Sequence, residues 1–161
     1  MIVSNSAVAA GADAVVSPGP QRVIFACGGH RFAVPLERVR EILTPQSFTR
    51  LPGCGPEVCG LTGVRGRVVT VFDLGVVLAG RRSAAVCDHR LMLVERGERL
   101  VGAAVDEVVA VTYAATEPFA PNTPILEGLP LRRDDAIGAG TIEEQSFILL
   151  DIDAILGRLL A

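Results

Sequence analysis

The sequence predicts a mainly β protein made of two small barrels around a shared core, with only short helices. The apolar residues are mostly Val, Leu, Ile and Ala, a bias that favours strands. The chain also carries 17 Gly and 10 Pro, spread between short apolar runs as turn residues are in barrels. The strongest indication is an internal repeat, described below. With 161 residues, the chain fits one domain or two closely packed subdomains.

The first repeated segment is a β-hairpin. Residues 22–34 resemble residues 90–102 at an offset of 68, and each copy reads strand, Gly-containing turn, strand. An apolar-acidic phrase follows each hairpin, at residues 39–42 and 105–108. Val-rich strands can resemble one another by chance, but a second match in the same order favours a true repeat.

The second match closes each half of the chain. Residues 68–78 resemble residues 146–156 at an offset of 78, and in both an apolar strand runs into an Asp. Asp73 and Asp151 are therefore predicted to cap short helices. The last helix, over residues 151–160, has one apolar face and is expected to lie where the two barrels meet. That face consists of Ile152, Ile155, Leu156, Leu159 and Leu160.

These patterns divide the chain. A disordered tail is predicted for residues 1–20. A signal peptide would carry Lys or Arg ahead of an apolar stretch, and these residues include neither. The folded domain is predicted over residues 21–161, with one subdomain at about 21–80, a second at about 90–150 and the helix at 151–160. Residues 81–90 are expected to be a charged linker, and 117–135 a long Pro-rich loop.

Charge and composition exclude several functions. A net charge of −3 argues against nucleic-acid binding, and no apolar run approaches the ~20 residues that cross a bilayer. The four cysteines, which we expect to be free thiols, include no C-x-x-C pair, so neither a metal site nor a cofactor is predicted. They are Cys27, Cys54, Cys59 and Cys87. No nucleophile signature surrounds them and no enzyme activity is expected, although a thiol enzyme using Cys54 or Cys59 stays an alternative.

Five phrases stand out in order along the chain: residues 39–42 (VREI), 51–52 (LP), 60–66 (GLTGVRG), 69–74 (VTVFDL) and 100–108 (LVGAAVDEV). Together they resemble the CheW family of chemotaxis coupling proteins, over about residues 22–160. The resemblance implies two five-stranded, SH3-like barrels and a non-catalytic adaptor in the cytoplasm, recruited to membrane-associated receptor arrays. Its implied partners are the cytoplasmic tip of a methyl-accepting chemoreceptor and the regulatory domain of a CheA-type histidine kinase.

The resemblance also implies a receptor-binding groove between the barrels. Its residues would be Val39, Glu41, Arg65, Gly102, Val105 and Val108. No residues are assigned to the kinase, which is expected to meet the end of a barrel. The three valines are equally consistent with a purely core role, and Arg65 with that of a solvated turn residue.

One departure from the family pattern stands in the turn phrase. Gly63 occupies the usual Asn position, and is expected to loosen the turn. A receptor-only or inhibitory binder that does not engage the kinase is therefore an alternative function.

Overall fold

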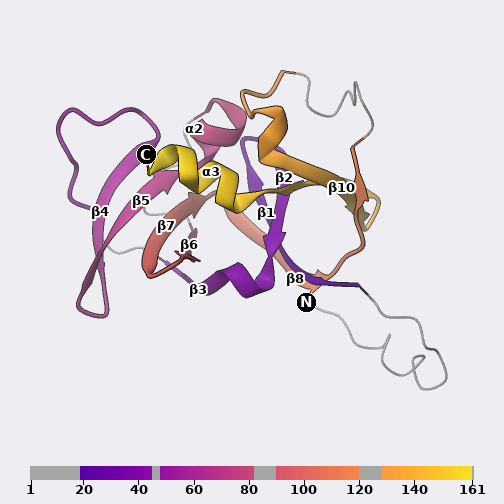
Figure 1. The fold of residues 1–161 in the computed structure, drawn as a ribbon, viewed down its shortest axis with the longest axis horizontal. Coiled ribbons are helices and arrows are strands. Elements are labelled where there is room, and N and C mark those ends of the chain that lie inside the picture. Colours follow the sequence, from indigo (N-terminus) through magenta and orange to yellow (C-terminus); the bar gives the residue numbers. More distant parts are fainter. Residues whose placement is uncertain (1–18, 45–47, 82–89, 120–127, 161) are drawn as a thin grey trace.

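Two β-sheets and short helices make up the protein (Figure 1). The computed structural model describes residues 19–44, 48–81, 90–119 and 128–160, so most of the predicted tail and linker lies outside the described residues. The strands are β1 (Gln21–Cys27), β2 (His30–Pro35), β3 (Val39–Leu43), β4 (Val58–Val64), β5 (Arg67–Asp73), β6 (Arg90–Arg96), β7 (Arg99–Val105), β8 (Glu107–Tyr113), β9 (Glu117–Pro118), β10 (Ala136–Ile142) and β11 (Gln145–Leu150). The helices are η1 (Leu36–Arg38), α2 (Leu74–Ala79), η4 (Arg133–Asp135) and α3 (Ile152–Leu159).

The sheets do not follow the two halves of the sequence. The six-stranded sheet runs in the order β8-β1-β2-β11-β10-β9, and the five-stranded sheet in the order β3-β6-β7-β5-β4. Each half therefore gives its hairpin to the other half's sheet: β1–β2 joins β8–β11, and β6–β7 joins β3–β5. The expected subdomains at 21–80 and 90–150 are thus corrected to two interleaved sheets. We name them barrel A (six strands) and barrel B (five strands).

In each sheet the two edge strands follow one another along the chain. β8 and β9 lie at opposite ends of barrel A, and β3 and β4 at opposite ends of barrel B. In barrel B, Thr49 and Leu61 close the circle with two backbone hydrogen bonds of 2.8 Å. Curling a sheet in this way protects edges that would otherwise be open to aggregation. Barrel A has six strands rather than five because its closing segment pairs over two residues as β9, whereas the equivalent pair in barrel B, Thr49 and Leu61, is an isolated bridge.

The structural repeat has an offset of 69 for the hairpins, not the predicted 68. β11 pairs in parallel with β2 and β5 with β7, and these ladders place Phe32 and Val101 in equivalent positions. Side chains alternate between the two faces of a strand. An error of one residue in the repeat offset would therefore match the inward-facing residues of one hairpin with the outward-facing residues of the other. The corrected offset also makes Val39 equivalent to Val108, and not to Val105.

The core has three parts. A large shared cluster lies between the barrels, and a smaller cluster fills each barrel. The predicted caps are present: Asp73 accepts from the Gly75 amide at 2.8 Å and Asp151 from the Ala154 amide at 3.1 Å. The buried residues of α3 join the shared cluster, as expected. No helix among the described residues is long and apolar enough to span a membrane.

Candidate partner-binding surface

An apolar strip runs over the shared core on the two equivalent strands β3 and β8. Val39 and Ile42 of β3, and Val108 and Val111 of β8, are half-buried and pack against the same cluster. At the corrected offset, Val39 matches Val108 and Ile42 matches Val111. The apolar strip is therefore a nearly symmetric surface, contributed equally by both barrels, with apolar area left partly exposed.

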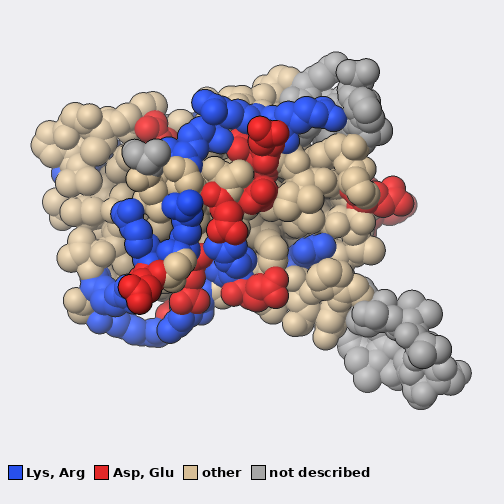
Figure 2. Space-filling model, viewed as in Figure 1, with Lys and Arg blue, Asp and Glu red and all other residues tan. Residues whose placement is uncertain are grey.

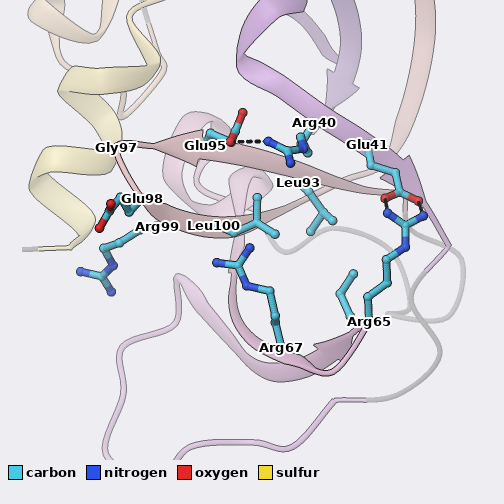
Figure 3. A pocket seen from close by; sticks show the side chains of 11 residues that line it. Arg40, Glu41, Arg65, Arg67, Leu93, Glu95, Gly97, Glu98, Arg99 and Leu100 are labelled. Carbon is cyan, nitrogen blue, oxygen red and sulfur yellow. Dashed lines mark hydrogen bonds and ion pairs between the residues drawn. The ribbon is translucent and has the colours of Figure 1, made fainter.

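Between the two strip residues of β3 in sequence, Glu41 forms a bidentate ion pair with Arg65. The Arg65 Nη1–Glu41 Oε1 distance is 2.7 Å and the Arg65 Nη2–Glu41 Oε2 distance is 2.8 Å. Arg65 stands in the two-residue β4–β5 turn with φ 50°, followed by Gly66 at φ 79°. Two positive φ values are typical of a type I′ hairpin turn. The turn thus directs the Arg65 side chain across to β3, and the pair connects β3 to the β4–β5 turn (Figure 3).

The open end of barrel B forms a pocket next to this ion pair. Its apolar floor comes from Val64, Leu93 and Leu100, which belong to the cluster inside barrel B or pack against it. Charged residues line the rest: Arg40, Glu41, Arg65, Arg67, Glu95, Glu98 and Arg99. Arg40 pairs with Glu95 at 2.6 Å. Figure 3 shows these side chains around the space between the β6–β7 hairpin and the β4–β5 turn, and we call this pocket the barrel mouth.

Two of the six residues expected at the receptor groove are buried. Val105 has no exposed surface and belongs to the shared core. Gly102 is buried inside barrel B, where a Cβ would lie 2.9 Å from side-chain carbons of Leu91 and Val71. The structure therefore brings Glu41 and Arg65 together, leaves Val39 and Val108 partly exposed, and encloses the other two. Ile42 and Val111 were missed, and the repeat at its correct offset would have indicated them.

The sequence suggested that Gly63 lies in the turn, but the structure places it elsewhere. It sits in β4 opposite Val68, and no atom lies within 4 Å of a Cβ built on it. The turn is formed by Arg65 and Gly66 alone. Gly63 thus leaves the geometry of the Glu41–Arg65 pair unaffected.

Charged side chains also hold α3 beside the barrel mouth. Arg38 donates two hydrogen bonds of 2.6 Å to the Asp153 carboxylate and one of 2.7 Å to the carbonyl oxygen of Glu95. The hydrogen bonds from Arg38 lower the pKa of Asp153 below its ordinary value. Figure 2 shows positive and negative side chains mixed across the middle of this face.

Comparison with known proteins shows which family has this architecture. A family model, the CheW-like domain, matches residues 21–159. The chain belongs to the CheW-like family. Protein PilI of Pseudomonas aeruginosa is 33% identical over 103 residues, which cover 64% of this chain and 58% of PilI. The chemotaxis protein CheW of Klebsiella aerogenes is 27% identical over 138 residues, which cover 86% of this chain and 82% of that protein.

The fold of this CheW-like chain matches a solved structure. The crystal structure of the CheW scaffolding protein of Thermoanaerobacter tengcongensis has a TM-score of 0.72 and 20% identity, and the match covers 86% of this chain and 88% of that one. The predicted family and its mainly β, two-sheet fold are thereby confirmed. Two of the relatives are named as chemotaxis proteins, and the solved structure is described as that of a scaffolding protein.

The described thiols of this CheW-like chain differ in how deeply they are buried. Cys27 is buried, and burial raises the pKa of its thiol well above the ordinary value. Cys54 is exposed and Cys59 half-buried, while Cys87 and His89 lie outside the described residues. Among residues that the structure describes, no group of three or more His, Cys, Asp or Glu could hold a metal ion.

Proposed function

We propose that this CheW-like protein is a non-catalytic adaptor that couples the cytoplasmic tip of a chemoreceptor to a CheA-type histidine kinase. The observation that carries the proposal is the apolar strip together with the Glu41–Arg65 pair, to which the same strand β3 contributes. A helical receptor tip presents an apolar stripe with polar flanks, which such a surface complements. Val39, Val108, Glu41 and Arg65 are proposed to contact or shape the receptor site, together with Ile42 and Val111.

Gly102 and Val105 have a different proposed role. Since both are buried, we assign them to supporting the strands behind the site rather than to contact with the receptor. Larger side chains there would alter binding indirectly, through barrel B and the shared core. The kinase is proposed to meet the end of a barrel, as the family resemblance implied.

The test is a binding titration of the purified chain against two proteins from its own genome. One is a receptor cytoplasmic tip, and the other is the kinase regulatory domain. Binding to both, without turnover, supports the coupling role. Binding to the receptor alone would favour the receptor-only or inhibitory alternative, and binding to neither by a folded protein would overturn both.

A charge swap separates two roles for Arg65. Arg65 is 76% exposed at its side chain, so Arg65→Glu should fold normally and lose receptor binding. The double variant Glu41→Arg/Arg65→Glu restores an ion pair with reversed polarity. Recovered receptor binding would mean that the pair positions β3 and the turn; continued loss would mean that Arg65 contacts the receptor directly. Arg50→Glu, another exposed arginine, is the matched control.

A further inference from the structure

The barrel mouth contains two arginines that its own glutamates do not neutralise. The other two arginines of the lining are paired, with Glu41 and Glu95. Arg67 and Arg99 are exposed and form no ion pair with any residue that the structure describes. Figure 3 shows the Arg67 side chain extending into the space between the two hairpins. With four arginines against three glutamates, the lining carries a net positive charge and has guanidinium groups available for an anion.

The fold does not require arginine at either position, as the internal repeat shows. At the offset of 78, Gln145 of barrel A is equivalent to Arg67, and at the offset of 69, His30 is equivalent to Arg99. All four residues begin a strand: β11, β5, β2 and β7 respectively. The same strands therefore start in barrel A without a guanidinium group, which indicates that the two arginines serve binding and not barrel closure.

We propose that the barrel mouth binds a small phosphate monoester. The phosphate would lie on Arg67 and Arg99, and the apolar part of the ester on the floor formed by Val64, Leu93 and Leu100. A phosphate monoester carries a charge of about −1.5 to −2 at neutral pH and has three acceptor oxygens. It can therefore engage two arginine forks at once, whereas a carboxylate has one charge and two oxygens.

The size and surroundings of the mouth suit such a ligand. Its volume of about 190 Å³ is below the ~300 Å³ at which sites for drug-sized molecules begin, so the occupant is small. The floor removes apolar surface of the ester from water and strengthens the charged hydrogen bonds next to it. The two ion pairs of the lining connect β3 to β6 and to the β4–β5 turn, and so hold the walls in place before a ligand arrives. Glu98 opposes the phosphate, which sets a modest affinity.

Calorimetric titration with phenyl phosphate tests the proposal. At pH 8 and about 0.02 M salt, the wild-type protein should bind this ester with a Kd of about 1 mM or lower. Inorganic phosphate lacks the apolar body and should bind at least about fivefold more weakly. Phenol lacks the phosphate and should bind at least about tenfold more weakly. Raising the salt to about 0.5 M should weaken the binding of phenyl phosphate severalfold.

The repeat also supplies the matched variant. Arg67→Gln/Arg99→His introduces the residues that barrel A has at the equivalent positions, so it should keep the fold by circular dichroism. Its affinity for phenyl phosphate should fall at least about tenfold at pH 8, where histidine is largely neutral. Arg50→Gln, exposed and outside the lining, should bind like the wild type.

Three outcomes would overturn the proposal. One is the absence of saturable binding by the folded wild type up to about 10 mM phenyl phosphate. Another is binding that Arg67→Gln/Arg99→His retains in full. The third is equal affinity for phenyl phosphate and inorganic phosphate, which would exclude an ester bound through its apolar part. The titration uses neither receptor nor kinase, so its result is separate from that of the test of the adaptor function.

Discussion

This protein has 15 Arg and no Lys, so arginine supplies every basic side chain other than histidine. Among the arginines that the structure describes, three form bidentate pairs, with Glu41, Asp135 and Asp153. These carboxylates differ in burial, since the Asp135 side chain is 1% exposed, that of Glu41 29% and that of Asp153 57%. Burial decides their contribution, because water screens exposed pairs and an unpaired buried charge is costly.

Two pairs on α3 provide a matched comparison. Arg158→Ala leaves the buried Asp135 carboxylate without its two hydrogen bonds of 2.6 and 2.8 Å, and should lower the free energy of unfolding by about 2–3 kcal/mol. Asp153→Ala, which removes the exposed carboxylate of the other pair and keeps the hydrogen bond from Arg38 to Glu95, should cost less than about 1 kcal/mol. Urea unfolding at neutral pH measures both, and equal losses would contradict this ranking.

Asp135 also predicts a pH dependence. Its burial alone would raise its pKa, but hydrogen bonds from Arg158 and the Arg132 amide, with the charges of both arginines, outweigh burial and lower the pKa. A carboxylate with a lowered pKa in the folded state stabilises the protein above the unfolded pKa of about 3.9. That stability is lost as pH falls through the folded pKa. Stability measured between neutral pH and pH 3 should therefore fall less steeply in Asp135→Asn than in the wild type; parallel curves would contradict this.

At the scale of the elements, two equivalent glycines allow the barrels to close. Gly60 and Gly138 are related by the offset of 78, and each follows a register shift in its strand. A Cβ at Gly60 would collide with the carbonyl oxygen of Thr49, and one at Gly138 with that of Glu117. These are the backbone segments that complete barrels B and A. A side chain at either position would hold the closing segment away from the sheet.

Gly138→Ala should therefore destabilise the protein by about 1–3 kcal/mol, since backbone atoms must move to admit the methyl group. Gly63→Ala is the control, because Gly63 also lies in a strand but has open space around its Cβ position. It should change stability by less than about 1 kcal/mol. Neither glycine has a positive φ, so the comparison isolates the steric effect. Similar losses in both variants would show that glycine in these strands is not needed for close approach.

At the scale of the whole molecule, the exchange of hairpins ties the two halves of the chain together. β1 contacts β8 from the other half, and β6 contacts β3. The shared cluster also takes residues from both sheets and from α3. Neither half contains a complete sheet, and a hairpin without its partner strands is at best marginally stable.

Separate fragments of residues 1–86 and 87–161 should thus fail to fold alone and fold when mixed. Far-UV circular dichroism during heating would measure this: each fragment should lack a cooperative transition, and the equimolar mixture should regain one. Cooperative unfolding of either fragment as a monomer would contradict the interleaved arrangement.

Part of the surface was readable from short patterns. The turn phrase identified Arg65 and the β3 phrase Glu41, and the structure pairs them. Gly102 and Val105 came from the same kind of phrase but are buried, because a motif does not reveal which face of a strand meets the core. Arg67, Arg99 and the apolar strip depend on segments far apart in the chain. No local sequence pattern predicts that these residues belong to a common surface.

The class of fold, its two repeated units, the Asp-capped helices and the family could be predicted from the sequence, since these depend on local periodicity and residue order. Which hairpin joins which sheet, and with what register, became known from the three-dimensional fold alone. Both hairpins have similar apolar patterns, so either assignment satisfies the local preferences. The choice is made by long-range pairing and by the shared core, which gathers residues far apart in the chain, such as Phe25 and Val94, into one cluster. Those same contacts create the apolar strip and the barrel mouth.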